Sequence, residues 1–385
     1  MGELLWYIPN TVQAGHRGDD SADGWADLEQ SVALARLAED HGWGGALIGT
    51  GWGRPDTFTV ATALAARTTV FKPLIAVRPG YWQPAQFASA AATLDHLTRG
   101  RVLVNVVSGQ DALAAYGDRE SDRAARYART GEFMRLVRKL WTEEDVTFRG
   151  RFFSVEGSTV VPRPYGTAHG AATGPGGAGR HPRLFFGGAS AEAEAVGATE
   201  ADVQLFWGEP VDDIAERIAR LGRLAASLGR EHAPLEFGLR VTTVARETSE
   251  AAWRDARARI AAMAENFRHW SRADWFREKN QGPSVGQQRL EKLADRGEVL
   301  DSCLYTAPGR FGGGGAGTTW LVGSYAEVAA ALGKYAGLGI THFILSDTPY
   351  VREVARLGDK LLPRLRGVTG QPSGGKKDGG RGDSG

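Results

Sequence analysis

Short apolar runs alternate with helical patterns along most of this chain. Eight runs rich in Val, Ile, Leu and Phe stop at Gly, Pro, Asn, Ser or charged residues, as buried strands do where they enter loops. They cover residues 4–8, 43–48, 71–77, 102–107, 184–186, 203–206, 235–244 and 341–345. Amphipathic stretches separate most of them, among them residues 121–141 and 211–228. This alternation is typical of parallel strands joined by right-handed helical crossovers.

The number of strands predicts a closed TIM (β/α)8 barrel, an α/β fold. The alternative is an open doubly wound sheet with an appended helical domain. Residues 146–155 alternate apolar and polar and predict a hairpin outside the main sheet, whereas 268–320 mix aromatic, charged and glycine residues and predict an insertion that forms a mobile lid. We expect one barrel domain over 1–368, with the insertion at 268–320, and a disordered tail rich in Gly, Lys, Asp and Ser over 369–385.

The fourth strand carries an amide in an otherwise apolar run. Asn105 lies inside RVLVNVVSG, and Ser108 and Gly109 follow at the carboxyl end, where barrel enzymes place their chemistry. A buried asparagine must find a partner for its side chain. Asn105 therefore either bonds a neighbouring backbone group, the commoner case, or points its amide at a ligand.

Two glycine-rich segments are candidates for anion binding. Gly187-Gly188-Ala189-Ser190 follows a strand and opens a helix, so its amides and hydroxyl form either a phosphate site at the helix N-terminus or a tight turn capped by Ser190. Residues 312–317 match G-x-G-x-x-G, but no strand precedes them and no acidic partner follows at the required distance. A lid hinge is the better interpretation of that second segment.

Composition narrows the class of protein. Lys plus Arg is 46 and Asp plus Glu is 45 in 385 residues, a net charge of +1 that favours neither nucleic acid nor a membrane surface as partner. The single cysteine, Cys303, forms no internal disulfide and suits a reducing cytoplasm. No apolar run is long enough to span a bilayer, no signal peptide is expected, and the eight histidines are scattered without metal-ligand spacing.

Many short motifs occur in the order found in one enzyme family. They are WYIPN, LIGTG, RVLVNVVSG, FFGGAS, FWGEP, FGLR, SVGQQR and GGAGTTWLVG. With them the chain resembles the flavin-dependent monooxygenases of the bacterial luciferase-like superfamily, and most closely the two-component alkanesulfonate monooxygenases. The resemblance extends from about residue 5 to residue 365.

The resemblance implies a specific chemistry. Reduced FMN would come from a separate NAD(P)H-dependent flavin reductase, and O2 would add to it as a C4a-peroxide that cleaves the carbon–sulfur bond of an organosulfonate into sulfite and an aldehyde. Such a site must exclude water. The protein would form a homodimer or homotetramer. The alternatives are a luciferase-like monooxygenase acting on another organosulfur compound or natural product, and a barrel that binds flavin or the deazaflavin F420 without sulfonate activity.

The resemblance also assigns residues. Its cofactor positions are Asn105, Ser108, Tyr127, Gly188, Ala189 and Ser190. Its catalytic positions are Trp207 and Arg240. On the substrate and lid side this chain departs from the family, since Arg54 replaces a cysteine, Thr242 a histidine, Thr348 a tyrosine and Tyr350 a histidine, while the arginine before GGAGT is missing and Arg310 lies nearby. These departures favour a substrate other than a simple alkanesulfonate.

Overall fold

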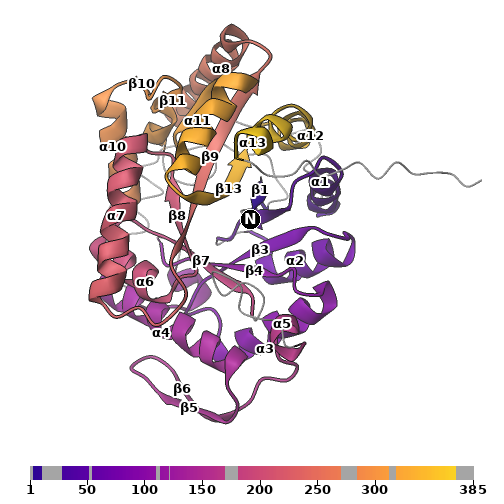
Figure 1. Ribbon diagram of the computed structural model, residues 1–385, viewed down its shortest axis with the longest axis vertical. Coiled ribbons are helices and arrows are strands. Elements are labelled where there is room, and N and C mark those ends of the chain that lie inside the picture. The colour runs from indigo at the N-terminus through magenta and orange to yellow at the C-terminus, as the bar shows by residue number, and fades with distance from the viewer. Residues whose placement is uncertain are drawn as a thin grey trace, which may run out of the picture.

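The computed structural model describes residues 3–10, 28–51, 54–109, 113–120, 122–169, 181–269, 284–311 and 318–369. Eight parallel strands close into a barrel inside a ring of helices (Figure 1). The barrel strands are β1 (Leu4–Ile8), β2 (Gly45–Ile48), β3 (Lys72–Val77), β4 (Leu103–Val106), β7 (Arg183–Gly187), β8 (Val203–Trp207), β9 (Glu236–Arg246) and β13 (Ile340–Ser346). The pairings of β8 with β9 and of β13 with β1 close the ring. This confirms the predicted TIM barrel and excludes the open sheet.

Most helices cover the outside of the barrel, and several begin at residues whose side chains cap the helix. They are α1 (Glu29–Asp40), α2 (Thr57–Ala66), α3 (Pro84–Thr98), α4 (Arg123–Thr142), α5 (Tyr165–Ala168), α6 (Ala191–Glu200), α7 (Val211–Ser227), α8 (Ser249–His269), α10 (Val285–Arg296), α11 (Tyr325–Gly337), α12 (Tyr350–Lys360) and α13 (Leu362–Thr369). Asp56, Asp122 and Ser190 cap α2, α4 and α6 through their side chains, and Ser324 forms a full capping box with Glu327. These caps satisfy amides that a helix start leaves without partners.

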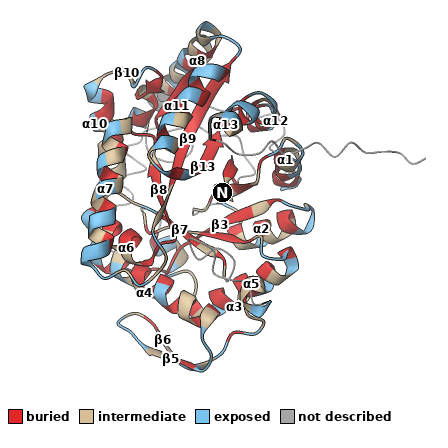
Figure 2. Cartoon of the chain, in the orientation of Figure 1, coloured by how far each residue is buried: buried red, intermediate tan, exposed pale blue. Residues whose placement is uncertain are grey.

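The core lies inside the barrel and between the barrel and its helices. The strands are buried along nearly their whole length, whereas the helices expose their outward faces (Figure 2). Every residue of β1 is buried, as expected for a strand covered on both sides. No helix in the described part of the chain is both long enough and apolar enough to cross a membrane.

The insertion contains more regular structure than the sequence indicates. It holds α10, the antiparallel strands β10 (Val299–Leu300) and β11 (Leu304–Tyr305), and the short 3-10 helix η2 (Ala307–Phe311). Strand β12 (Trp320–Ser324) follows and pairs in parallel with β9. The strand prediction missed β10 and β11 because each has only two residues, and it missed β12 because its partner β9 lies far away in the sequence. Residues 270–283 and 312–317, which include the predicted hinge, lie outside the described part of the chain.

Strand β9 has two sets of partners and therefore forks the sheet. Its first half pairs with β8 up to the register Trp207 to Arg240, and its second half pairs with β12 from the register Trp320 to Thr242. Val244, Tyr305 and Trp320 then form a second, smaller core with residues of α8. The insertion is thus packed as an extension of the barrel sheet, and Arg240 lies where the two sets of pairings part.

Two smaller expectations are also resolved. The predicted hairpin exists as β5 (Val146–Arg149) and β6 (Ser154–Ser158), a two-stranded sheet outside the barrel. The described part of the chain ends in two short helices, because α12 ends at Lys360 and α13 begins at Leu362. Of the predicted tail over 369–385, Thr369 is the last residue of α13, and the rest lies outside the described residues, as does most of the glycine-rich segment over 166–180.

Candidate active site

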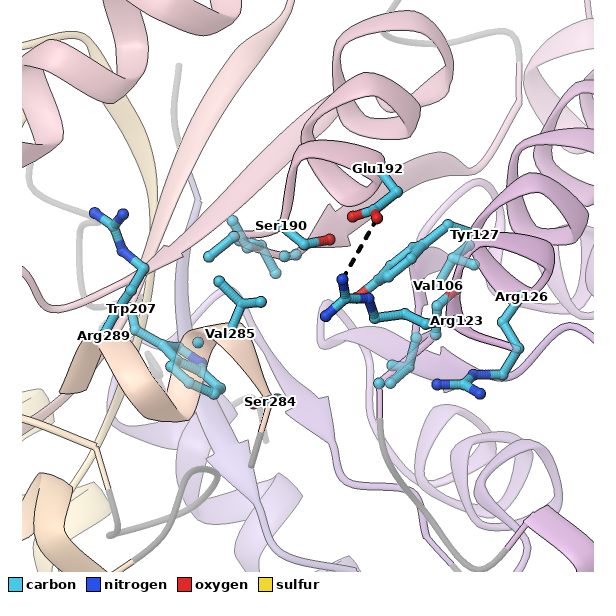
Figure 3. A pocket seen from close by; sticks show the side chains of 18 of the residues that line it. Val106, Arg123, Arg126, Tyr127, Ser190, Glu192, Trp207, Ser284, Val285 and Arg289 are labelled. Carbon is cyan, nitrogen blue, oxygen red and sulfur yellow. Dashed lines mark ion pairs between the residues drawn. The ribbon is translucent and has the colours of Figure 1, made fainter. Parts of the chain in front are cut away.

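A cavity of about 810 Å³ opens at the carboxyl ends of the barrel strands. Its walls come from β4 and the residues after it, the start of α4, the turn between β7 and α6, the end of β8, the middle of β9 and the start of α10. This is the face on which barrel enzymes carry their active sites, and the volume is that of a cofactor-sized pocket. Figure 3 shows side chains of α4 and α6 on one side of the cavity and those of Trp207 and α10 on the other.

One end of the cavity is built to hold an anion. Ser190 caps α6 by accepting a hydrogen bond from the Ala193 amide at 3.2 Å, so the positive end of the helix dipole faces this wall. Arg123, Arg126 and Tyr127 reach the same wall from α4 (Figure 3). The interpretation of Ser190 as an N-cap is therefore confirmed, and Ser190 also lines a cavity, while phosphate binding at this turn stays a prediction.

Side chains at this end are already held in place. Tyr127 is hydrogen-bonded to Ser190, and burial raises the pKa of its phenol, which keeps it a neutral donor. Arg123 lies 3.5 Å from Glu192, an ion pair drawn as a dashed line in Figure 3. Backbone and Ser190 hydrogen bonds lower the pKa of Glu192, so this carboxylate is charged. A bound phosphate would compete with Glu192 for Arg123.

Gly188 lets the anion-binding turn lie against its helix. A Cβ atom at this position would come within 2.4 Å of the Ala193 Cβ, which no side chain tolerates. The Gly188 carbonyl accepts hydrogen bonds from Arg217 at 3.0 Å and from Gln204 at 3.4 Å. These contacts fix the turn before any ligand binds.

The inner end of the cavity is apolar apart from an amide and a guanidinium. Leu47, Val106, Leu205 and Trp207 line it, and Asn105 is only half buried because its side chain faces the opening. Ser108 also lines the cavity, but its hydroxyl is bonded to Thr130 of α4 and so ties the end of β4 to that helix.

Asn105 offers a direct test of ligand contact. We expect Asn105→Leu to weaken reduced-FMN binding about fivefold to tenfold, the contribution of one hydrogen bond, while the thermal unfolding temperature stays close to that of the parent. Fluorescence titration under anaerobic conditions measures the affinity. A folded variant that binds flavin as tightly as the parent would return Asn105 to a structural role.

Arg240 is the most unusual charge in the barrel. Its side chain is buried, lines the cavity and lies over the Tyr7 ring with the guanidinium carbon 4.7 Å from the ring centroid. Nη2 donates to the Ser346 hydroxyl at 2.9 Å, whereas Nη1 has no hydrogen-bond partner within the described residues. Burial lowers the pKa of this guanidinium. A buried cation without a counter-ion is costly, and an anion in the cavity would satisfy it.

A second group of charges fastens the insertion to the barrel. The Glu209 carboxylate, buried just after β8, accepts from Arg217 of α7 through one oxygen and from Arg289 of α10 through the other. Arg217 also bonds Glu194 at 3.3 Å, and its guanidinium carbon lies 4.7 Å from the centre of the Phe206 ring. One buried network thus connects the anion-binding turn, the end of β8 and the insertion.

The start of α10 closes the cavity beside Trp207. A Cβ atom on Gly286 would lie 2.8 Å from Cζ3 of the Trp207 ring, so the backbone of the helix rests directly on the indole. Ser284 caps the helix through the Gln287 amide at 3.1 Å. The SVGQQR motif therefore has a structural meaning: its serine starts the helix, its glycine permits the contact and its arginine binds Glu209.

We expect Gly286→Ala to loosen this closure. The added methyl group overpacks against Trp207, which costs about 1–3 kcal/mol and moves α10 outward. Water entry should then raise hydrogen peroxide formed per NAD(P)H consumed when a reductase supplies reduced FMN. Gly297→Ala is the matched control at the other end of α10, since its Cβ would meet Leu300 only at 3.4 Å. Equal peroxide yields from both variants would show that Gly286 is not a closure point.

The predicted site residues separate into three groups. Asn105, Ser108, Tyr127, Trp207 and Arg240 line one cavity, together with the turn that ends in Ser190. Thr242 and Tyr350 do not line it but lie beside Arg240: Thr242 Oγ1 is 3.4 Å from Ser346 Oγ, and the Tyr350 ring is 6.0 Å from that of Tyr7.

The remaining substrate-side candidates lie elsewhere. Arg54 lines a second cavity and donates to the Pro9 carbonyl. Thr348 is buried, and its amide donates to Asp347. Arg310 is in η2, where it bonds Ala294 O at 2.9 Å and Asp295 at 3.2 Å, and it lines neither cavity.

Sequence reasoning assigned no functional role to Glu209, Arg217 or Arg289. Glu209 lies just after a predicted strand, and Arg289 is the last residue of the SVGQQR motif. These two positions were the only features of the sequence that could have marked either residue as part of the site.

The barrel and its cavity define the class: a (β/α)8 protein with a cofactor-sized pocket at the carboxyl ends of its strands. A model of the luciferase-like monooxygenase family matches residues 3–342, and the chain belongs to that family.

Solved structures of the same fold bind different cofactors. Riboflavin lyase, solved with modified FMN and riboflavin, matches with a TM-score of 0.72 and 21% identity over 97% of this chain and 93% of that one. EDTA monooxygenase from a Chelativorans species matches with a TM-score of 0.73 and 16% identity over 96% and 98%. The F420-dependent tetrahydromethanopterin reductase of Methanopyrus kandleri gives 0.64 and 14% over 94% and 99%. At these identities the likeness concerns the fold.

Proposed function

We propose that this protein is an FMN-dependent monooxygenase that receives reduced FMN from a separate NAD(P)H-dependent reductase and cleaves the carbon–sulfur bond of an organosulfonate. The observation that carries the proposal is Arg240, a buried guanidinium that lines the cavity with one nitrogen unsatisfied. Its surroundings suit a negative charge that arrives with a ligand, such as a reduced flavin or an anionic substrate.

The cavity residues fit FMN. Ser190, Tyr127 and the cations of α4 suit a phosphate, and the close packing at Gly188 holds the backbone of the turn against the start of α6. The apolar wall of Leu47, Val106 and Leu205 suits a flat ring, and Asn105 suits a polar edge of that ring. When bound, reduced FMN supplies the electrons with which O2 is activated.

The protein's own residues would position the ligand and keep water out of the cavity. Glu209 holds α10 over the cavity through Arg289, and Trp207 fills the gap below it, so that water is excluded from the inner end. Arg240 orients an anion at the opposite wall without giving up a proton, because a guanidinium stays charged.

Two alternatives concern the ligands. The replacements at Arg54, Thr242, Thr348 and Tyr350 favour a substrate other than a simple alkanesulfonate, which extends the proposal to other organosulfur compounds and natural products. F420 is the competing cofactor, because structures of this fold use either flavin or deazaflavin. Parallel titrations with FMN and F420 separate the two cofactors.

Sulfite release tests the reaction. Purified protein, a flavin reductase, FMN and NADH are incubated with a panel of alkyl and aryl sulfonates, and sulfite is measured with a thiol-reactive dye. We expect sulfite from at least one sulfonate, dependent on both proteins and on O2. If reduced FMN is bound and oxidised but no sulfonate gives sulfite, the substrate assignment is wrong while the flavin assignment stands.

We also propose that the protein works in the cytoplasm as a homodimer or homotetramer, as the family resemblance implies. Analytical ultracentrifugation of the full chain measures its mass in solution. A monomer at micromolar concentration would contradict the oligomer.

A further inference from the structure

A second cavity of about 530 Å³ lies beside the first. It is lined by the loop after β2, the start of α2, the end of β3 and the segment that leads into α3. Ala76 of β3 lines it and pairs in register with Asn105 of β4, which lines the first cavity. Neighbouring strands are about 4.8 Å apart, so the two cavities are adjacent. Arg78 lines the second cavity and Gly109 the first, and a hydrogen bond of 2.7 Å from Arg78 Nη1 to the Gly109 carbonyl joins them.

The walls of this second cavity are aromatic. Phe58 and Trp82 have ring centroids 5.6 Å apart, and both also pack on the buried Phe87. Tyr81 and Tyr116 stack with centroids 3.8 Å apart and planes 22° apart. All four side chains are half buried and line the cavity. Aromatic rings anchored on one side and open on another form a surface suited to a flat apolar ligand.

The charges on the walls are mainly positive. Arg54 and Arg78 line the cavity, and the single carboxylate among the described lining residues is Asp56. Asp56 is already used as the cap of α2, since Oδ1 accepts from the Thr59 amide at 2.8 Å and from the Thr59 hydroxyl at 2.7 Å. Arg54 donates to the Pro9 carbonyl through Nη1. Because a guanidinium has five N–H donors, this bond leaves Arg54 able to donate to a ligand as well.

We propose that this second cavity is the substrate subsite and that it selects an aromatic acid, in the proposed reaction an arylmethanesulfonate, whose CH2 group carries the sulfonate and is oxidised to an aldehyde with loss of sulfite. The aromatic ring of the substrate would lie with Phe58 and Trp82 on one side and the Tyr81–Tyr116 pair on the other. Its acidic group would be attracted by Arg54 and Arg78. The substrate would then lie one strand away from the flavin wall at Asn105. This inference rests on the proposed function for the reaction, but the binding itself does not require turnover.

Binding without turnover tests the subsite. The full chain, saturated with oxidised FMN, is titrated by calorimetry with naphthalenesulfonate and with hexanesulfonate as the alkyl comparison. We expect naphthalenesulfonate to bind more tightly. Trp82→Ala should weaken naphthalenesulfonate binding about fivefold to tenfold, the effect of one aromatic contact, weaken hexanesulfonate binding less, and leave FMN binding unchanged.

Two further variants distinguish the loss of aromatic stacking from the loss of charge and from a general loss of stability. Trp253→Ala is the control, because Trp253 is a half-buried tryptophan of α8 that packs on Tyr305 and lines neither cavity. Arg54→Gln should weaken naphthalenesulfonate binding about tenfold and leave neutral naphthalenemethanol unaffected.

The two proposals can fail separately. Equal affinities for the two sulfonates, or equal effects of Trp82→Ala and Trp253→Ala, would overturn the subsite. Selective binding of naphthalenesulfonate, with no sulfite or aldehyde formed from naphthalenemethanesulfonate under reduced FMN and O2, would uphold the subsite and contradict the proposed reaction.

Discussion

Arg240→Met should lower kcat/KM of the reductase-coupled reaction about 10²- to 10³-fold, the usual effect of removing one preorganised charged donor. The same change should leave the free energy of unfolding unchanged or raise it. Arg240 has no carboxylate partner in the described structure, so methionine removes a buried charge without leaving another one unpaired. Activity assays and chemical denaturation of the same preparation measure both quantities.

The conservative variant sharpens this test. Arg240→Lys keeps a positive charge but loses the forked geometry, and we expect it to recover part of the lost activity. An Arg240→Met protein that is both active and destabilised would show that this guanidinium supports the barrel and serves no ligand.

Arg246→Met should destabilise the protein by about 3 kcal/mol, near the lower end of the range for breaking a buried ion pair. Arg246 lies six residues further along the same strand but has the opposite environment: it contacts Asp255 at 2.7 Å, Asp347 at 2.9 Å and Glu353 at 3.3 Å. The last two carboxylates are buried, and their charge raises the pKa of Arg246. Arg259 and Arg356 remain near them, which limits the loss.

The pH dependence of this loss is a further check. Burial and the neighbouring Asp347 raise the pKa of Glu353, so mildly acid solution protonates it more readily than an ordinary glutamate. Protonation removes the repulsion that Arg246→Met leaves behind, and the gap in stability between variant and parent should narrow as the pH falls. Urea unfolding at neutral and mildly acid pH measures the gap. A difference in unfolding free energy of less than about 1 kcal/mol between variant and parent at neutral pH is what two surface ion pairs would contribute. It would contradict the account of Arg246 as part of a buried ionic network.

The eight barrel strands were predictable because each is a short apolar run that ends at a loop residue. The turn at Ser190 and the strand end at Asn105 were predictable for the same reason: local pattern and chain order place both at the catalytic face. Strand β12 was missed because it is stabilised by the second half of β9, a partner about 80 residues earlier in the chain. A single sequence holds no local signal of such a pairing.

The charged network was missed for a related reason. Arg217 and Arg289 look like solvent-facing residues of amphipathic helices, and only the folded chain shows that both reach the Glu209 carboxylate. The second cavity was also unpredictable, because Phe58, Trp82 and Tyr116 come from three separate segments. The contrast between Arg240 and Arg246 depends in the same way on the end of β13 and on α12.

Binding of reduced FMN tests the central proposal most directly. The full chain is titrated anaerobically with photoreduced FMN while tryptophan fluorescence is followed, with oxidised FMN and F420 as comparisons and an unrelated protein as the reference. We expect saturable quenching by reduced FMN at micromolar concentration, weaker binding of F420, and reduced affinity in Asn105→Leu. If reduced FMN binds no better than to the unrelated protein, the protein is not a flavin-dependent monooxygenase.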